Sequence, residues 1–354
     1  MTVSVSSDGK YAISSHQNNE LVLWDIENKK NSLIHERANI YSAYFIKKSN
    51  LFLWQNLNNT VLVTNIRGEN VESFPLDYPT YGHKISKNLK SYLSVSEENR
   101  IGYGLPLEQK TIKAAGGSFI GLGKLLNISW NEDKNILVTS GFATPNAADP
   151  DFEPLSEQEK DGYKDLEGVV LWDITARRAL AKFPGNAAKT FATLSPDGQY
   201  VVSNDENGRG RVWMTKTYEL VIPHLASLYH GLIVNPDANY KEWKRDKTNL
   251  IPIPKDYLGE NTIAVKFINN DQYLRIVENN HYAILYDVTN PLPLKYLGLG
   301  TSPYPATDRY DRNTAIDTAP EVGVLVAGHK RDGGISVYQY DRDTQSLKTV
   351  WVVD

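Results

Sequence analysis

The 354-residue chain contains no cysteine, so disulfide bonds, thiolate metal sites and cysteine nucleophiles are excluded. It also lacks any apolar run approaching the roughly 18 residues that a membrane-spanning helix needs. The formal net charge is −4, and no basic stripe of the kind that binds nucleic acid is present. What remains is a chain of 41% hydrophobic residues that can bury a large core but has no general nucleic-acid surface.

The first strand pattern begins at Val3, which leaves no room for a signal peptide in this sequence. We therefore expect a cytoplasmic protein, or a periplasmic protein or lipoprotein if an export segment precedes Met1 in the gene. The residues alone favour neither compartment over the other.

A tight turn followed by two strands, the second ending in Trp, occurs twice in the chain. Residues 7–11 (Ser-Asp-Gly-Lys-Tyr) precede Trp24, and residues 196–200 (Pro-Asp-Gly-Gln-Tyr) precede Trp213. In each copy the Asp lies 16 positions before the Trp. Because one small antiparallel sheet cannot bury both of its faces, such copies must stack against one another.

Seven segments fit one template of short strands joined by turns. Strand-forming residues in them are separated by Asp-Gly, Asn-Asn and Gly-Gly, which are typical of antiparallel meanders. The segments lie at residues 3–35, 43–66, 83–114, 126–174, 190–222, 264–288 and 322–353. This pattern predicts an all-β chain in which residues 1–354 form a single domain.

These repeats resemble the WD40-repeat β-propellers. The resemblance covers most of the chain and rests on the Asp-Gly turns and on the motifs Trp24-Asp25, Trp172-Asp173, Val212-Trp213-Met214 and Tyr286-Asp287. It implies a seven-bladed β-propeller in which each blade is a four-stranded antiparallel sheet. The Gly-His dipeptide that precedes the first strand of the family's repeats has one candidate here, Gly82-His83. The mean spacing of about 51 residues (354/7) exceeds the family's ~40–45, which indicates long loops and a divergent, bacterial member.

The long loops fall at particular connections. If the strands of each repeat are labelled a to d, the a-to-b and c-to-d turns leave one end of the sheet, and the b-to-c and d-to-a connections leave the other. The turns of the first kind are tight. The long connections are of the second kind, at residues 142–167, 224–261 and 298–313, together with the Gly-rich stretch 116–124. We expect them to form one insertion-bearing face that binds a ligand or partner.

Aromatic and cationic side chains on these loops are of the kinds that dominate the energetics of protein interfaces. The competing interpretation is that the aromatic side chains only pack the insertions onto the propeller. The expected partner contacts are Tyr240, Trp243, Arg245, Tyr304, Arg309 and Tyr310, with Arg209, Lys330 and Arg331 from shorter turns at the same end.

Three other patterns suggest chemistry but lack the spacing for it. The stretch 149–167 holds eight acidic residues, yet Pro154 and Lys160 stand where an EF-hand needs Gly and Glu, so we expect a solvated acidic rim. His224 and His230 have no metal-ligand spacing. The Gly-rich stretch lacks the Ser or Thr of a phosphate loop, because Leu125 follows Lys124. We therefore expect neither a metal nor a cofactor.

The sequence thus favours a monomeric, non-catalytic platform that binds one or more proteins through its insertion-bearing face. An enzyme or small-ligand binder with a site at the mouth of the central channel is the alternative, since residues from different blades can converge there. A structural subunit of an envelope or secretion assembly is a third possibility.

Overall fold

The structure is a computed structural model that consists of β-strands and turns. Among the described residues there is no helix, and hence none long and apolar enough to span a membrane. The described residues are 2–16, 20–35, 40–56, 60–75, 80–87, 89, 91–96, 100–104, 118–120, 125–141, 169–176, 178–183, 190–205, 210–225, 228–229, 232–234, 250–252, 262–277, 282–290, 293–299, 313–329 and 334–353.

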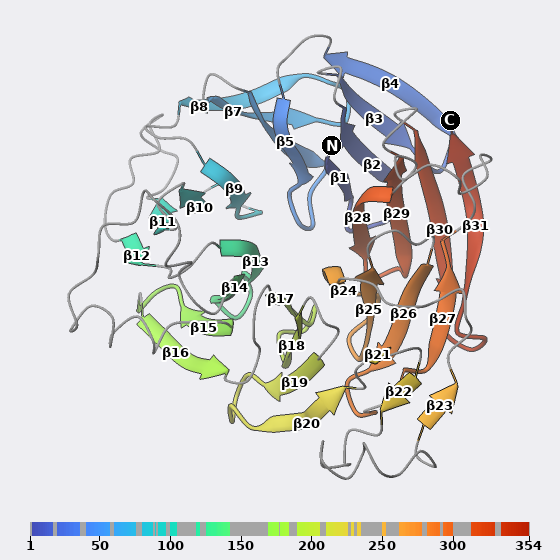
Figure 1. The fold of residues 1–354 in the computed structure, drawn as a ribbon. Coiled ribbons are helices and arrows are strands. Elements are labelled where there is room, and N and C mark those ends of the chain that lie inside the picture. The colour runs from blue at the N-terminus through green and yellow to red at the C-terminus, as the bar shows by residue number, and fades with distance from the viewer. Residues whose placement is uncertain are drawn as a thin grey trace, which may run out of the picture. The chain divides into compact units, whose positions relative to one another are not determined.

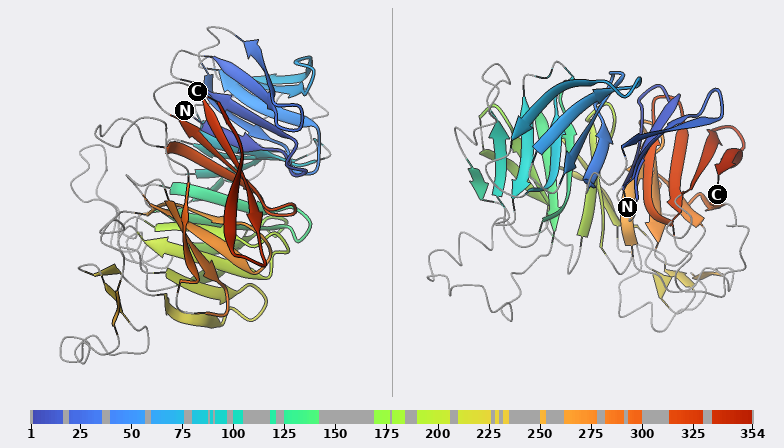
Figure 2. Two further views of the ribbon diagram at one scale, coloured as in Figure 1. Left: turned by 90° about the vertical axis from the view of Figure 1, so that its right-hand side faces the viewer. Right: turned by 90° about the horizontal axis from the view of Figure 1, so that it is seen from above.

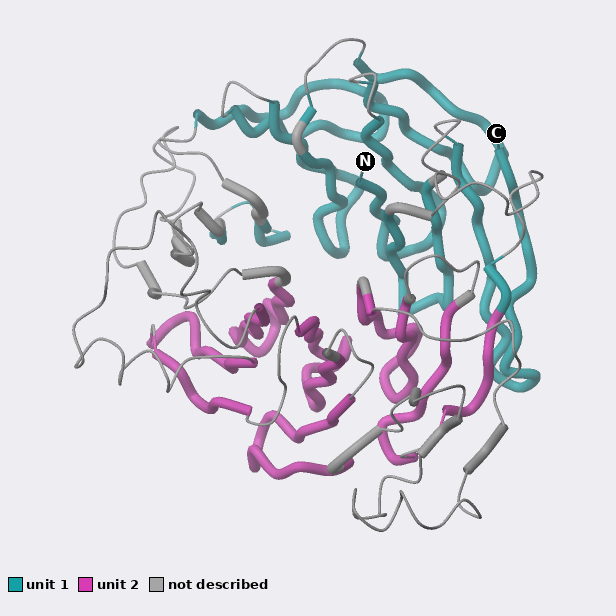
Figure 3. The backbone as a smooth tube through the Cα atoms, viewed as in Figure 1, with its two compact units in different colours: residues 1–120, 298–354 teal, residues 121–297 magenta. Residues whose placement is uncertain are grey.

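The chain divides into two compact units. Residues 1–120 and 298–354 form unit 1, and residues 121–297 form unit 2 (Figure 3). Each unit is built from antiparallel sheets whose strands are consecutive in the chain (Figure 1). The single domain and the number of seven blades stay predictions.

In unit 1, each four-stranded sheet is a meander. The strands are β1 (Thr2–Val5), β2 (Tyr11–Ser15), β3 (Leu21–Asp25) and β4 (Lys30–His35); β5 (Ile40–Phe45), β6 (Leu51–Asn56), β7 (Thr60–Asn65) and β8 (Asn70–Pro75); β9 (Thr80–Ile85), β10 (Tyr92–Ser96), β11 (Arg100–Gly104) and β12 (Ser118–Ile120); and β28 (Asn313–Ala319), β29 (Val324–His329), β30 (Ile335–Asp341) and β31 (Ser346–Val353).

Unit 2 has the same construction with one addition. Its four-stranded sheets are β13 (Leu125–Asn131), β14 (Ile136–Gly141), β15 (Val169–Asp173) and β16 (Arg178–Phe183); β17 (Thr190–Leu194), β18 (Tyr200–Asp205), β19 (Gly210–Met214) and β20 (Leu220–Leu225); and β24 (Thr262–Phe267), β25 (Gln272–Val277), β26 (Tyr282–Asp287) and β27 (Lys295–Gly298).

The addition is a three-stranded sheet inside the insertion predicted at 224–261. Its strands are β21 (Leu228–Tyr229), β22 (Leu232–Val234) and β23 (Leu250–Pro252), and they lie apart from the four-stranded sheets in both views of Figure 2. The sequence analysis treated this segment as a plain loop. Strands of two or three residues are too short to show an alternating pattern, which explains the omission.

Two details of the predicted third repeat are wrong. Its last strand lies at Ser118–Ile120, beyond the predicted end at residue 114 and inside the stretch 116–124 that we expected to be a crossover. The long connection in this sheet, residues 105–117, is therefore of the c-to-d kind. In addition, Gly82-His83 lies within β9, paired with β10, and does not precede the strand.

The cores lie between neighbouring sheets. In unit 1, Val3, Val5 and Trp24 from the N-terminal sheet pack with Val324, Val337 and Trp351 from the C-terminal sheet. In unit 2, Val138 and Leu171 pack with Val201 and Trp213. The inner strand β2 is buried along most of its length because neighbouring sheets of unit 1 pack on both of its faces. The sheets are thereby fixed face to face within each unit.

Candidate functional site

Small hydroxyl side chains connect the innermost strands of unit 1. The Thr2, Ser4 and Ser7 hydroxyl groups accept hydrogen bonds from the backbone N–H groups of Ala43, Phe45 and Lys48, at 3.1, 3.1 and 2.9 Å. Each pair is 41 positions apart, so β1 and β5 run parallel with a constant offset. Corresponding ends of these two sheets therefore lie on the same side.

The C-terminal sheet joins the N-terminal sheet through the same layer. One carboxylate oxygen of Asp317, on β28, accepts hydrogen bonds from the Ser4 hydroxyl group at 2.9 Å and from the Val5 N–H group at 3.1 Å. Trp24 and Trp351 add an edge-to-face contact with ring centroids 5.9 Å apart. Two segments more than 300 positions apart in sequence are thus bonded directly.

Unit 2 repeats this arrangement. The Ser129 hydroxyl group accepts from the Leu194 N–H group at 3.0 Å, and the Asn131 amide donates to the Pro196 carbonyl at 2.9 Å. Both pairs are 65 positions apart, so β13 and β17 are also parallel. As in unit 1, the a-to-b turns of neighbouring sheets lie side by side.

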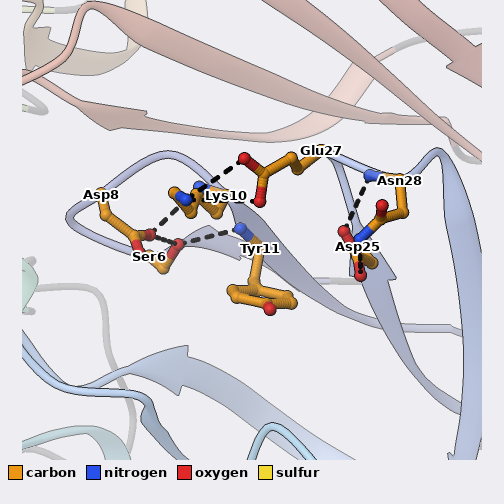
Figure 4. A network of polar contacts seen from close by, with 7 residues as sticks. All are labelled: Ser6, Asp8, Lys10, Tyr11, Asp25, Glu27 and Asn28. Atoms are coloured by element: carbon orange, nitrogen blue, oxygen red, sulfur yellow. Dashed lines mark hydrogen bonds and ion pairs between the residues drawn. The ribbon is translucent and has the colours of Figure 1, made fainter.

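The a-to-b turns are closed by their own side chains. In the first turn the Ser6 hydroxyl group donates to Asp8 at 2.6 Å and accepts from the Tyr11 N–H group, while Lys10 forms an ion pair with Glu27 at 3.2 Å (Figure 4). The second copy, at Ser195 and Asp197, has the same 2.6 Å bond. The predicted Asp-Gly turns are confirmed, and their polar side chains bond to neighbouring groups of the same sheet.

The c-to-d turn after β3 is closed in the same way. Partial burial acts to raise the pKa of Asp25, but hydrogen bonds from Asn28 and the charge of Lys30 outweigh it and hold that pKa below its ordinary value (Figure 4). The carboxylate is therefore committed to the turn and is not poised to act as a general acid.

Buried Trp side chains are tied to hydroxyl groups of the neighbouring strand. Trp24 donates to Ser14 at 2.7 Å, and Trp172 donates to Thr139 at 2.8 Å, in each case from the third strand to the second. In the sheet β5–β8 the roles are exchanged, since Trp54 on the second strand donates to Thr64 on the third at 3.0 Å. The hydrogen bond from Trp to a hydroxyl group is thus present in all three sheets, although in β5–β8 the two residues have exchanged strands.

In the first sheet this contact extends to a histidine. The Ser14 hydroxyl group lies 2.7 Å from His16 Nε2, and His16 is only 8% exposed. Burial lowers the pKa of His16, although the nearby Glu20 carboxylate acts to raise it. When the ring is neutral, His16 Nε2 can accept a hydrogen bond from the Ser14 hydroxyl group, while that hydroxyl group accepts one from Trp24 Nε1. The sequence analysis did not single out this histidine.

The three predicted insertions correspond to connections between described strands. Residues 142–168 join β14 to β15, residues 226–261 separate β20 from β24 and include β21–β23, and residues 299–312 join β27 to β28. All nine expected contact residues lie outside the described residues: Arg209, Tyr240, Trp243, Arg245, Tyr304, Arg309, Tyr310, Lys330 and Arg331. The acidic stretch 149–167 and His230 lie outside them as well.

No group of three or more His, Asp or Glu side chains that could hold a metal ion occurs in the part of the chain that the structure describes. The described polar side chains do form hydrogen-bonded groups, but those traced above join strands or close turns. What this geometry can do is hold the ends of the sheets rigidly.

No protein-family model matches the chain, and no curated protein matches its sequence. Solved structures do resemble it. The β-propeller domain of Cps50 (Swd1) from Myceliophteria thermophila is 13% identical with a TM-score of 0.61, and the match covers 96% of each chain. Hsv2 from Kluyvelomyces marxianus is 12% identical with a TM-score of 0.55, over 99% of this chain and 97% of that one.

The fold is that of a WD40-like β-propeller. Identities of 12–13% show the fold alone, so the bacterial origin expected from the sequence stays a prediction. The propeller interpretation of the repeated Trp and Asp-Gly motifs is confirmed, and the hydroxyl groups between the inner strands are an addition that the sequence analysis missed.

Proposed function

We propose that the protein is a monomeric, non-catalytic platform that binds protein partners at the end of its sheets that carries the insertions 142–167, 224–261 and 298–313. The observation that carries the proposal is the contrast between the two ends of the sheets. In the sheets β13–β16, β17–β20 and β24–β27, the a-to-b and c-to-d connections are short, whereas the insertions are b-to-c or d-to-a connections; in the sheet β9–β12, by contrast, the long connection 105–117 is of the c-to-d kind.

The turn end offers little to a partner. At the Asp8 and Asp197 turns, the carboxylates are already hydrogen-bonded to neighbouring groups of the same turn. A partner that bound there would replace satisfied bonds and gain little net free energy. Long connections, in contrast, are more often functional than idle in compact domains.

The strands from which the long connections start are rigid, and this favours the insertion-bearing end as the binding surface. In unit 2, β13 and β17 run parallel, which supports a common side for the roots of the 142–168 and 226–261 connections. Loops on rigid strands lose less conformational entropy on docking than loops on a mobile scaffold. The aromatic and Arg residues predicted above would anchor the partner, and the acidic stretch 149–167 would orient it by charge.

The test is capture of partners from native extract by three forms of the protein. The first is wild type, the second carries Trp243→Ala, Arg309→Ala and Tyr310→Ala, and the third is a turn-end control with Lys10→Ala, Glu27→Ala and Asn28→Ala. We expect the second form to lose partners that wild type and the control retain. Retention of the same partners by the second form would contradict the contact residues, and their loss only from the control would place binding at the turn end.

A further inference from the structure

The longest insertion returns to the framework at Thr262, the first residue of β24. The register between β24 and β25 shifts at this point. Val265 pairs with Arg275 and Ala264 with Ile276, but the next pair is Thr262 with Val277. Ile263 is therefore the extra residue of a β-bulge. Since a shift of one residue moves side chains to the other face of a strand, the bulge brings Thr262 onto the face that carries Arg275.

Arg275 occupies a special place in the repeat. In the sheets β1–β4 and β13–β16, the Trp on the third strand pairs with a residue of the second strand. Two positions after that residue lies a hydroxyl residue, Ser14 or Thr139, which accepts the hydrogen bond of the Trp side chain. In the sheet β24–β27, Tyr286 stands in the Trp position opposite Tyr273. Two positions after Tyr273 is Arg275, a much longer side chain with several donors.

The arginine uses this reach to hold Thr262. Its Nε–H group donates to the Thr262 hydroxyl oxygen at 2.9 Å, and both side chains are 1% exposed. Burial raises the pKa of Tyr286, while the charge of Arg275 and its hydrogen bond to the phenol act in the opposite direction. The guanidinium group thus contacts both the first strand and the third strand of the sheet.

The surroundings keep this group in place. Tyr273 and Tyr286 stack with ring centroids 5.4 Å apart, and both pack against Val202, Val212 and other apolar residues of the sheet β17–β20. A hydrogen bond in such a dry layer is stronger than one in water and is costly to break. Of the two roots of the 226–261 segment, the one at Thr262 is therefore fixed from inside the core.

We propose that Arg275 is a positioning residue for the 226–261 insertion and acts by holding Thr262 at its root. This inference rests on the proposed function, in which the insertion contacts the partner. It also names a buried group, remote in sequence from the insertion, on which presentation of the contact residues depends.

The test compares two variants that remove a buried hydroxyl group at constant volume. Thr262→Val removes the acceptor of Arg275, whereas Thr139→Val removes the acceptor of Trp172 in another sheet of unit 2. Amide hydrogen exchange is followed in β21, β22 and β23. We expect exchange there to become about tenfold faster in Thr262→Val and to stay unchanged in Thr139→Val.

Exchange in β21–β23 that is unchanged in Thr262→Val, or that rises equally in Thr139→Val, would overturn the inference. Arg275→Met should reproduce the effect of Thr262→Val, and the Thr262 variant carries the test if Arg275→Met does not fold. Partner capture separates the two proposals. Faster exchange with unchanged capture would support the positioning role and contradict the role of this insertion in binding.

Discussion

At the residue scale, single Ser and Thr hydroxyl groups carry much of the buried polar bonding. Ser4 connects three strands, since its hydroxyl group donates to Asp317 on β28 and accepts from the Phe45 N–H group on β5. A hydroxyl group suits this role because it can donate and accept at once and occupies little volume. Long side chains at these positions would separate the sheets.

The buried histidine gives a prediction about pH. Because burial lowers the pKa of His16 in the folded protein, the unfolded chain takes up a proton first as pH falls below about 6.5. The contribution of His16 to stability is therefore intact above that pH and declines below it. At pH 5.5 the loss relative to a non-titrating residue is at most about 1.4 kcal/mol.

Chemical unfolding of wild type and His16→Gln at pH 7.5 and pH 5.5 measures this effect. Glutamine retains hydrogen-bonding groups near Ser14 but does not titrate, and His35 titrates equally in both proteins. We expect wild type to lose more stability than the variant between the two pH values. An equal loss would show that His16 does not contribute.

At the element scale, the Asp-Gly turns depend on backbone geometry. Gly9 has a φ of +70°, and a Cβ atom there would lie 2.8 Å from Val324 Cγ2 and 2.9 Å from Val322 Cγ2. Gly68 has a φ of +82°, but a Cβ atom there would come no closer than 3.3 Å to Ile34. The two glycines therefore separate backbone strain from steric contact.

We expect both Gly→Ala changes to cost about 1–2 kcal/mol from the left-handed backbone, and Gly9→Ala to cost more because it also presses on the C-terminal sheet. Denaturant titration of the two variants gives the comparison. A larger loss in Gly68→Ala than in Gly9→Ala would contradict the packing of this turn against Val322 and Val324.

The join between β28 and β1 also belongs to this scale. Asp317→Ala removes the acceptor of two hydrogen bonds and should cost about 2–3 kcal/mol, whereas Asp317→Asn keeps one carbonyl oxygen and should cost less. Unfolding free energies of the two variants test the order. Equal losses would mean that the charge, and not the pair of bonds to one oxygen, stabilises the join.

Sequence patterns predicted the elements well where residues alternate strongly and turns are Asp-Gly. They failed at β12 and at β21–β23, which are three residues or shorter. They also missed the bonds of Ser4 and Ser129, because the partners are 41 to 313 positions away and no local pattern marks them. A hydroxyl residue on the first strand of successive repeats is the signal that could have indicated this layer.

At the scale of the whole molecule, the observations that identify the fold differ in kind from those that support the proposed function. Repetition of one small sheet identifies a propeller even when identity to solved propellers is 12–13%, because the stacking of sheets depends on pattern and not on particular residues. The contact residues lie on connections between strands, where the repeat imposes no pattern. Their roles could be proposed from chemistry but not from periodicity.

The most direct measurement is a hydrogen-exchange footprint of the intact protein with a captured partner bound. Binding by the insertion-bearing end predicts protection of peptides within 142–168, 226–261 and 299–312, with the turns at 6–11 and 195–200 unchanged. Protection of those turns, with the three connections exchanging as in the free protein, would contradict the platform we propose.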